Sequence, residues 1–145
     1  MRVWIAVLAL TLLPLAAGCG DRTESYCSAV KDHQEELTKI TGAGGKDALI
    51  KALSIFEDLQ DKAPSDITDE WQQVVSRIKD LDDALSAAGV DPATYDRGKP
   101  RQGLTREQRA RIDAAARELG SGETLAALQG LDQEARDVCQ TPLTL

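Results

Sequence analysis

The chain has 145 residues, and its 17 Lys and Arg against 24 Asp and Glu give a formal net charge of −7 at pH 7. Nucleic-acid binding depends on neutralising phosphate groups, so this acidic balance argues against a nucleic-acid partner. It also argues against adhesion to anionic lipid headgroups through surface charge. With two Trp, two Tyr and one Phe, the chain has too few aromatic rings for a platform that stacks bases or sugars.

The N-terminal segment, residues 1–18, differs in composition from the rest of the chain. Arg2 is its only charged residue, an apolar run follows over residues 3–13, and Pro14 ends that run. A basic start, an apolar run and a region of small residues are typical of an export signal. The run is shorter than the roughly 20 apolar residues that a membrane-spanning helix needs. We therefore expect residues 1–18 to be a signal peptide that is removed after export.

The residues that end at Cys19 distinguish two routes of export. They read Leu15-Ala16-Ala17-Gly18-Cys19 and resemble the bacterial lipobox. The resemblance implies that the Cys19 thiol receives a diacylglyceryl group and that the chain is cut just before it. Acyl chains would then hold the mature protein on the extracytoplasmic face of the cell membrane, and because one chain binds only marginally, two are expected. The alternative is ordinary secretion with cleavage near Ala17, which leaves Cys19 as a free thiol.

The cysteine count supports lipidation independently. The chain has three cysteines, and an odd cysteine in an exported protein needs an explanation. Lipidation of Cys19 leaves Cys27 and Cys139, which we expect to form a disulfide outside the cytosol. Redox-active dithiols usually lie close together in sequence, so this distant pair is interpreted as structural. Closing so long a loop stabilises a fold by about 4 to 5 kcal/mol in the chain-entropy model.

The rest of the chain is predicted to be a tether and one helical domain. Residues 19–25 are the predicted lipid-anchored tether, in which residues 20–25 reach at most about 20 Å. Residues 26–145 are the predicted domain, because apolar residues recur there every three or four positions and no segment alternates like a strand. The predicted helices cover residues 24–41, 47–62, 66–88 (or 69–88), 105–119 and 123–139.

Local signals mark the predicted helix ends. Asp21 with Glu24 and Thr105 with Gln108 have the spacing of capping boxes. Glycine or proline follows each predicted helix, at Gly42, Ala63-Pro64, Gly89, Gly120 and Pro142. The inner face of the third helix is predicted to be Ile67, Trp71, Val74, Ile78, Leu81 and Leu85, and that of the last helix Leu125, Leu128, Leu131, Ala135 and Val138. Because the connections are short, the predicted fold class is all-α, an antiparallel four- to five-helix bundle closed by one disulfide.

His33 is the only histidine and lies on the apolar stripe of the first predicted helix, next to Asp32 and one turn before Glu36. Zinc sites need three or four ligands from Cys, His and carboxylates, and here one histidine would have to supply all the imidazole. We therefore expect no metal, and interpret His33 as a partly buried side chain hydrogen-bonded to a carboxylate. No nucleophile has a second histidine to draw on, and residues 42–45 lack the Lys-Ser/Thr of a phosphate-binding loop. The sequence thus predicts neither an enzyme nor a cofactor.

Charge is unevenly distributed along the chain. Residues 57–83 are strongly acidic, whereas residues 97–111 carry six bases and one acid. One interpretation is that the basic segment folds against the acidic helices and is partly neutralised there. The other is that the long loop at residues 89–103 and the following helix present a basic patch to an envelope protein or an anionic polymer. The patch residues are Arg97, Lys99, Arg101, Arg106 and Arg109.

Several features together are similar to the uncharacterised small α-helical lipoproteins of actinobacteria. They are the lipobox, Tyr26-Cys27 near the start of the first helix, Ala63-Pro64 before the helix of Trp71, and Val138-Cys139. The resemblance implies an envelope location and brings no activity. Our leading hypothesis is a non-catalytic interaction module of the cell envelope. The alternative is a carrier of an apolar small molecule or lipid, and an enzyme ranks third.

Overall fold

The protein is described by a computed structural model that covers residues 19–144. The predicted signal peptide, residues 1–18, lies outside the described residues. Within residues 19–144 the chain forms six helices and no strand, which confirms the all-α class. The helices are α1 (Cys19–Gly42), α2 (Ala48–Lys51), α3 (Leu53–Lys62), α4 (Thr68–Ala87), α5 (Arg106–Leu119) and α6 (Gly122–Cys139).

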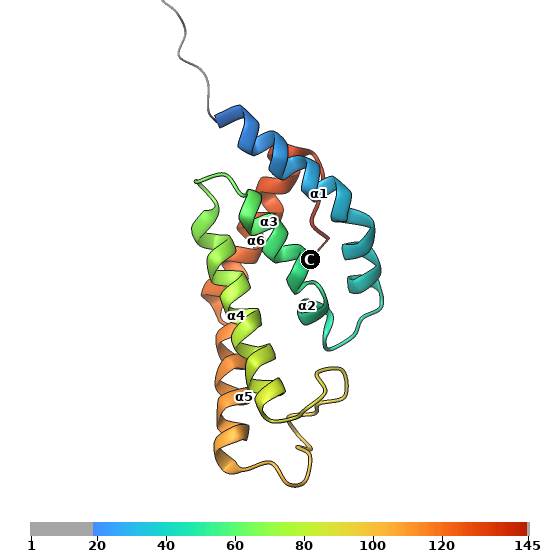
Figure 1. Cartoon of the computed structure of the whole chain (residues 1–145), viewed down its shortest axis with the longest axis vertical. Coiled ribbons are helices and arrows are strands. Elements are labelled where there is room, and N and C mark those ends of the chain that lie inside the picture. Colours follow the sequence, from blue (N-terminus) through green and yellow to red (C-terminus); the bar gives the residue numbers. More distant parts are fainter. Residues whose placement is uncertain (1–18, 145) are drawn as a thin grey trace, which may run out of the picture.

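Helix α4 organises the molecule. Its 20 residues span about 30 Å along the long axis, and it contacts α3, α5 and α6. Helix α5 runs antiparallel beside the C-terminal half of α4, and α6 continues in the same direction beside the N-terminal half (Figure 1). Helix α1 packs against α3 and α6. The start of α1 and the loop before α5 therefore lie at opposite ends of the molecule.

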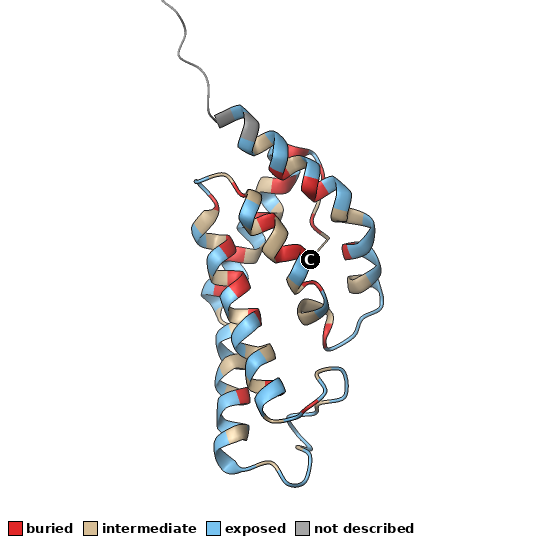
Figure 2. Cartoon of the chain, viewed as in Figure 1, coloured by how far each residue is buried: buried red, intermediate tan, exposed pale blue. Residues whose placement is uncertain are grey.

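Two apolar clusters divide the described residues into two regions. We name residues 19–78 and 121–144 the proximal body and residues 79–120 the distal arm. The proximal body contains the larger cluster, centred on Trp71, whose ring lies 5.7 Å from that of Phe56 and whose Nε1 donates to the Tyr26 hydroxyl at 3.2 Å. The distal arm contains only Leu85, Val90 and Ile112 as buried apolar residues. Buried positions accordingly crowd the upper part of Figure 2.

Most helices begin or end where capping residues, proline or glycine predict. Thr105 and Gln108 form the predicted capping box at the start of α5, with both reciprocal hydrogen bonds present. Helix α3 ends at Ala63 before Pro64, and Gly89 follows α4 with a φ of 63° that suits glycine. The end of α6 uses Gln140 in the left-handed conformation, with the Thr141 amide donating to the Ala135 carbonyl.

Two predicted helix boundaries are wrong. Helix α1 begins at Cys19, so residues 20–25 are helical and the predicted capping box at Asp21 and Glu24 does not mark its start. Gly20 is the only strong helix-disfavouring residue there, and its cost of roughly 1 kcal/mol does not prevent the helix. The predicted helix over residues 47–62 divides at Ala52 into α2 and α3. Ile50 of α2 contacts both apolar clusters, so the break allows α2 to pack against both of them.

The predicted inner face of α6 is partly wrong. Leu131 and Ala135 are fully buried, but Leu125 and Val138 are 48% and 45% exposed. Thr124, Ala127 and Cys139 are buried in their place. A shift of one position rotates a helix face by about 100°. The helix thus buries three small side chains in place of two larger apolar ones, with Cys139 bonded to Cys27 of α1 and Thr124 hydrogen-bonded to Glu118 of α5.

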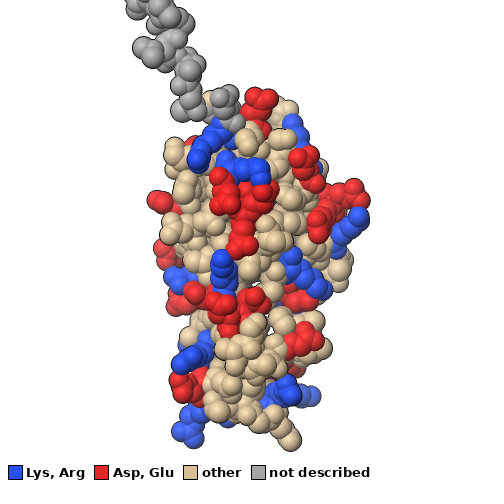
Figure 3. All heavy atoms as spheres, in the orientation of Figure 1, with Lys and Arg blue, Asp and Glu red and all other residues tan. Residues whose placement is uncertain are grey.

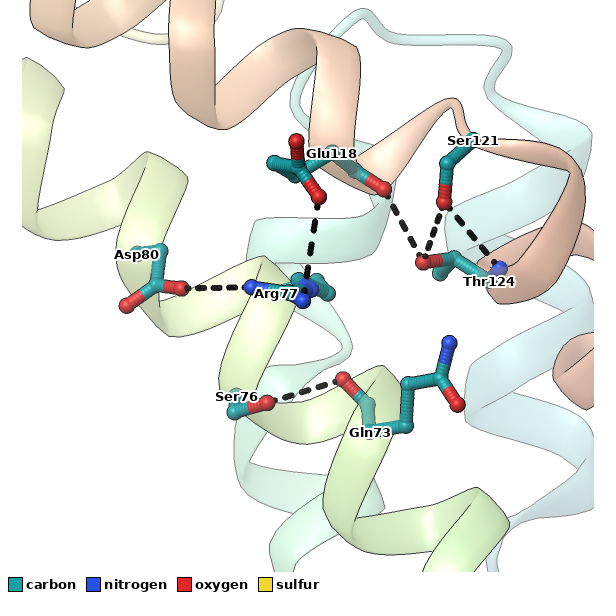
Figure 4. A network of polar contacts seen from close by, with 7 residues as sticks. All are labelled: Gln73, Ser76, Arg77, Asp80, Glu118, Ser121 and Thr124. Atoms are coloured by element: carbon teal, nitrogen blue, oxygen red, sulfur yellow. Dashed lines mark hydrogen bonds and ion pairs between the residues drawn. The ribbon is translucent and has the colours of Figure 1, made fainter.

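The corner between α5 and α6 is held by a polar network (Figure 4). The fully buried Thr124 hydroxyl donates to the Glu118 carbonyl at 2.9 Å, and the Thr124 amide donates to Ser121 Oγ at 3.2 Å. Arg77 of α4 lies between Glu118, at 3.7 Å, and Asp80, at 3.6 Å. These contacts fix where the distal arm meets the proximal body, because they satisfy the polar groups at the helix ends.

Candidate functional site

Cys19 is the first residue of α1 and lies at the end of the molecule away from the distal arm (Figure 1). Its side chain is outside the described part of the chain. Because residues 20–25 are helical, they advance by about 1.5 Å each instead of the extended spacing first assumed. Ser25 therefore lies roughly 9 Å from Cys19 along the helix axis.

The predicted Cys27–Cys139 disulfide is confirmed. It links α1 to the last residue of α6, with a distance of 5.0 Å between the two Cα atoms. Cys139 is buried and Cys27 packs against the larger apolar cluster. The bridge therefore links the first helix of the proximal body covalently to its last helix, and both sulfurs belong to a structural disulfide.

His33 is a partly buried histidine hydrogen-bonded to a carboxylate, as predicted. Its Nε2 lies 2.9 Å from Oδ2 of Asp58 on α3. Asp58 also contacts Lys62, and these two partners, Lys62 first, lower the pKa of the Asp58 carboxyl below its ordinary 3.8. The arrangement ties α1 to α3. Among the side chains that the structure describes, no group of three or more potential metal ligands is present.

Two of the five predicted patch residues are engaged within the distal arm. Arg97 Nε donates to Asp113 Oδ1 of α5 at 3.0 Å, and Arg101 donates to the Gly89 carbonyl at 2.9 Å. Both bonds fasten the loop to the helices beside it. The acidic residues 57–83 instead pair with neighbouring bases, as Lys79 does with Glu57 across α3 and α4. The basic segment is thus partly neutralised, but by the distal arm itself.

Lys99, Arg106 and Arg109 are exposed and form no ion pair with any residue that the structure describes. Lys99 lies in the loop before α5, and the two arginines lie in its first two turns. In Figure 3 basic side chains stand on both sides of a largely uncharged surface at the lower end of the molecule. The distal arm therefore presents available positive charge at the end opposite Cys19.

A cavity of about 300 Å³ lies where the distal arm meets α2. Helices α4 and α5 supply part of its lining, and Ile50 of α2 and Lys46 close the side toward the proximal body. The loop contributes Tyr95, whose carbonyl accepts from Lys46 Nζ at 3.5 Å. The lining residues are Lys46, Ile50, Leu81, Leu85, Pro92, Tyr95, Asp96, Arg97, Ile112 and Ala116.

Of these lining residues, only Arg97 was singled out from the sequence as a candidate functional residue. Leu81, Leu85 and Ile112 were correctly expected to face inward, but their hydrophobic spacing gives no sign that a space remains between them. Lys46 and Tyr95 are far apart in sequence and meet only through the fold. The one usable signal was Tyr95 itself, an aromatic residue inside a loop rich in polar residues.

Comparison with protein-family models, with curated proteins and with solved structures finds no match to this chain. Among the helices in the described range, none is long and apolar enough to cross a membrane.

Proposed function

We propose that this protein is a membrane-anchored extracytoplasmic lipoprotein that acts as a non-catalytic interaction module of the cell envelope. In this proposal acyl chains on Cys19 attach the proximal body to the membrane, and the helices form a bundle that carries the distal arm outward. The partner is an envelope protein or an anionic polymer, contacted through Lys99, Arg106 and Arg109.

The single observation that carries the proposal is the separation of the two sites along the long axis. Helix α1 begins at Cys19 at one end, whereas the loop before α5 lies at the other end (Figure 1). Helix α4, which runs from the proximal body into the distal arm, is alone about 30 Å long. Attachment at one end thus leaves the basic surface free to meet a partner away from the membrane.

Electrostatics also supports this division. Three cations on the distal arm have no acidic partner within residues 19–144, although the chain as a whole carries a net −7. Local positive charge on an acidic protein favours encounter with anionic surfaces in one orientation. The acidic proximal body would meanwhile be repelled by anionic lipid headgroups, so attachment would depend on the acyl chains.

The anchor is tested by labelling cells with an alkyne-bearing fatty acid and comparing the wild-type chain with Cys19→Ser. We expect label and membrane retention for the wild type and neither for Cys19→Ser. Ser28→Ala, an exposed position on the same helix, is the matched control and should keep both. A wild-type chain that carries no label contradicts the anchor.

The partner surface is tested by placing a photo-cross-linking residue at position 99, on the distal arm, or at position 31, on the proximal body. Both lysines are exposed. We expect a discrete cross-linked species from position 99 that disappears when Arg106→Glu and Arg109→Glu are added to the same chain. Equal cross-linking from both positions, or none from position 99, contradicts the distal contact.

A further inference from the structure

The cavity at the junction has a floor made of hydrocarbon. Ile50, Leu81, Leu85, Ile112 and Ala116 line it, and none of these side chains carries a hydrogen-bonding group. A polar group placed there without a partner would lose its hydrogen bonds to water, which is unfavourable. The part of a ligand that enters must therefore be apolar, which excludes sugars and nucleotides from the floor.

The rim, in contrast, is charged. Lys46, Asp96 and Arg97 line it, and Asp113, which pairs with Arg97, offsets their formal net of +1. Lys46 makes no ion pair among the described residues, and its only polar contact is the 3.5 Å bond to the Tyr95 carbonyl. Arg97 is held by its Nε bond to Asp113, which leaves its terminal nitrogens available, and Asp96 Oδ1 accepts from the Gly98 amide at 2.8 Å.

We propose that this cavity binds a medium-chain fatty acid, with the hydrocarbon chain on the floor and the carboxylate between Lys46 and Arg97. An anionic end group complements the two cations, of which one is preorganised and one is unpaired. At about 30 Å³ for each group of water or methylene size, 300 Å³ accommodates roughly ten such groups. The volume is at the small end of the roughly 300–1,000 Å³ found for ligand pockets.

This site goes beyond the proposed function and does not depend on it. It uses neither the Cys19 anchor nor the exposed Lys99, Arg106 and Arg109. A failure of the lipid-labelling or cross-linking experiments therefore leaves it standing, and its own failure leaves the anchor and the distal contact standing.

The test is an NMR titration of the isotope-labelled full chain with sodium decanoate, sodium octanoate and decanol. We expect amide shifts concentrated at residues 46–50, 92–97 and 112–116. Each methylene removed should weaken binding by about fourfold, so octanoate should bind about fifteenfold more weakly than decanoate. Decanol, which has the same chain without the charge, should bind more weakly than decanoate. Shifts elsewhere, or equal affinity for decanol and decanoate, would overturn the proposal.

Two matched pairs of variants locate the binding. Ala116→Leu fills the cavity and should weaken decanoate binding by about tenfold or more, whereas Ala115→Leu, which lies on the α4–α5 groove outside the cavity, should not. Lys46→Gln should weaken decanoate by about two- to fivefold and leave decanol unchanged, whereas the exposed Lys31→Gln should change neither. Because Lys46 is on the surface, the Lys46→Gln and Lys31→Gln pair still tests the carboxylate site if Ala116→Leu fails to fold. Unchanged decanoate affinity in Lys46→Gln overturns the carboxylate site.

Discussion

The proximal body and the distal arm are built from similar helices but differ in how much they bury. The proximal body has nineteen buried core residues and the disulfide, whereas the distal arm has three buried core residues and no covalent link. Helix formation in short segments depends mainly on tertiary packing, so equal local signals do not give equal stability. The distal arm should open more readily than the proximal body.

Helix α5 shows the reason for the difference. Ile112 is its only buried residue, Ala115 and Ala116 are partly buried, and Leu119 at its end packs against the larger apolar cluster. Alanine favours the helix intrinsically but contributes little apolar surface when it is covered. The capping box of Thr105 and Gln108 adds a local contribution. Helix α5 therefore relies on local preferences and on its packing along α4, and it has fewer buried residues than α6.

The two regions also differ in what they offer a ligand. The junction cavity and the unpaired cations Lys99, Arg106 and Arg109 belong to the distal arm or border it. Binding surfaces are commonly carried by loops that a stable scaffold positions. The division of stability thus matches the proposed division of roles between anchor and contact.

Removal of the disulfide should lower the free energy of unfolding more than any other change considered. The double variant Cys27→Ala, Cys139→Ala removes a bridge across a sequence separation of 112 residues, which the chain-entropy model values at about 4 to 5 kcal/mol. Urea unfolding measures the loss. Since the bridge lies in the proximal body, we expect the stability of the two regions to become more equal. An unchanged unfolding midpoint would contradict a structural disulfide.

Large-to-small substitutions in the two cores should separate the regions next. Trp71→Ala should cost about 3–5 kcal/mol and destabilise the whole chain, because Trp71 is fully buried between Phe56 and Tyr26. Leu85→Ala should cost about 2 kcal/mol, near the low end for such changes, and act mainly on the distal arm. Thermal unfolding followed by circular dichroism measures both costs, and the fluorescence of Trp71 follows the proximal body in Leu85→Ala. Equal costs in the two cores would show that the regions unfold as one unit.

A smaller effect is expected from the two helix caps. Thr105→Ala removes the capping box of α5, and Ser121→Ala removes the acceptor of the Thr124 amide at the start of α6. Each should cost about 1 kcal/mol. The Thr105 change should raise hydrogen exchange in α5 alone, whereas the Ser121 change should also affect α6. A global effect from Thr105→Ala would contradict an arm that opens independently.

Neutralising a single carboxyl group should change stability least, and the two groups Glu134 and Asp58 should give changes of opposite sign. Burial first, then Asp66 and Asp137, raises the pKa of Glu134, so its charged form opposes folding above that pKa. Glu134→Gln should therefore stabilise the protein at pH 7, and the gain should vanish near pH 3. Asp58 has a lowered pKa, so Asp58→Asn should destabilise at pH 7 and match the wild type once the pH falls below that pKa. Unfolding curves at pH 7, near pH 3 and below the pKa of Asp58 show whether each variant is more or less stable than the wild type.

The sequence predicted features that depend on neighbours along the chain and missed those that depend on packing. Thr105 with Gln108, Pro64 and Gly89 marked helix ends correctly because capping and backbone geometry are local. The rotation of α6, which exposes Leu125 and Val138, accompanies contacts made across the fold, such as the bond of Cys139 to Cys27. The break at Ala52 likewise reflects two separate cores.

The candidate sites divide in the same way. Counting cysteines paired Cys27 with Cys139 correctly. The sequence also predicted that His33 bonds a carboxylate, but only the structure identifies that carboxylate as Asp58. Of the basic residues, Arg97 and Arg101 proved to be engaged within the distal arm. The cavity could not be predicted, because Lys46 and Tyr95 meet only when α2 and the loop are packed together.

Hydrogen exchange measured by mass spectrometry on the full chain tests the unequal stability of the two regions most directly. We expect the amides of α5 to exchange at least about tenfold faster than those of α6, which corresponds to a difference of about 1.4 kcal/mol in opening free energy. The two helices are comparable in length and both carry N-terminal caps, so local structure does not account for such a difference. Equal exchange in α5 and α6 would contradict a distal arm that opens independently of the proximal body.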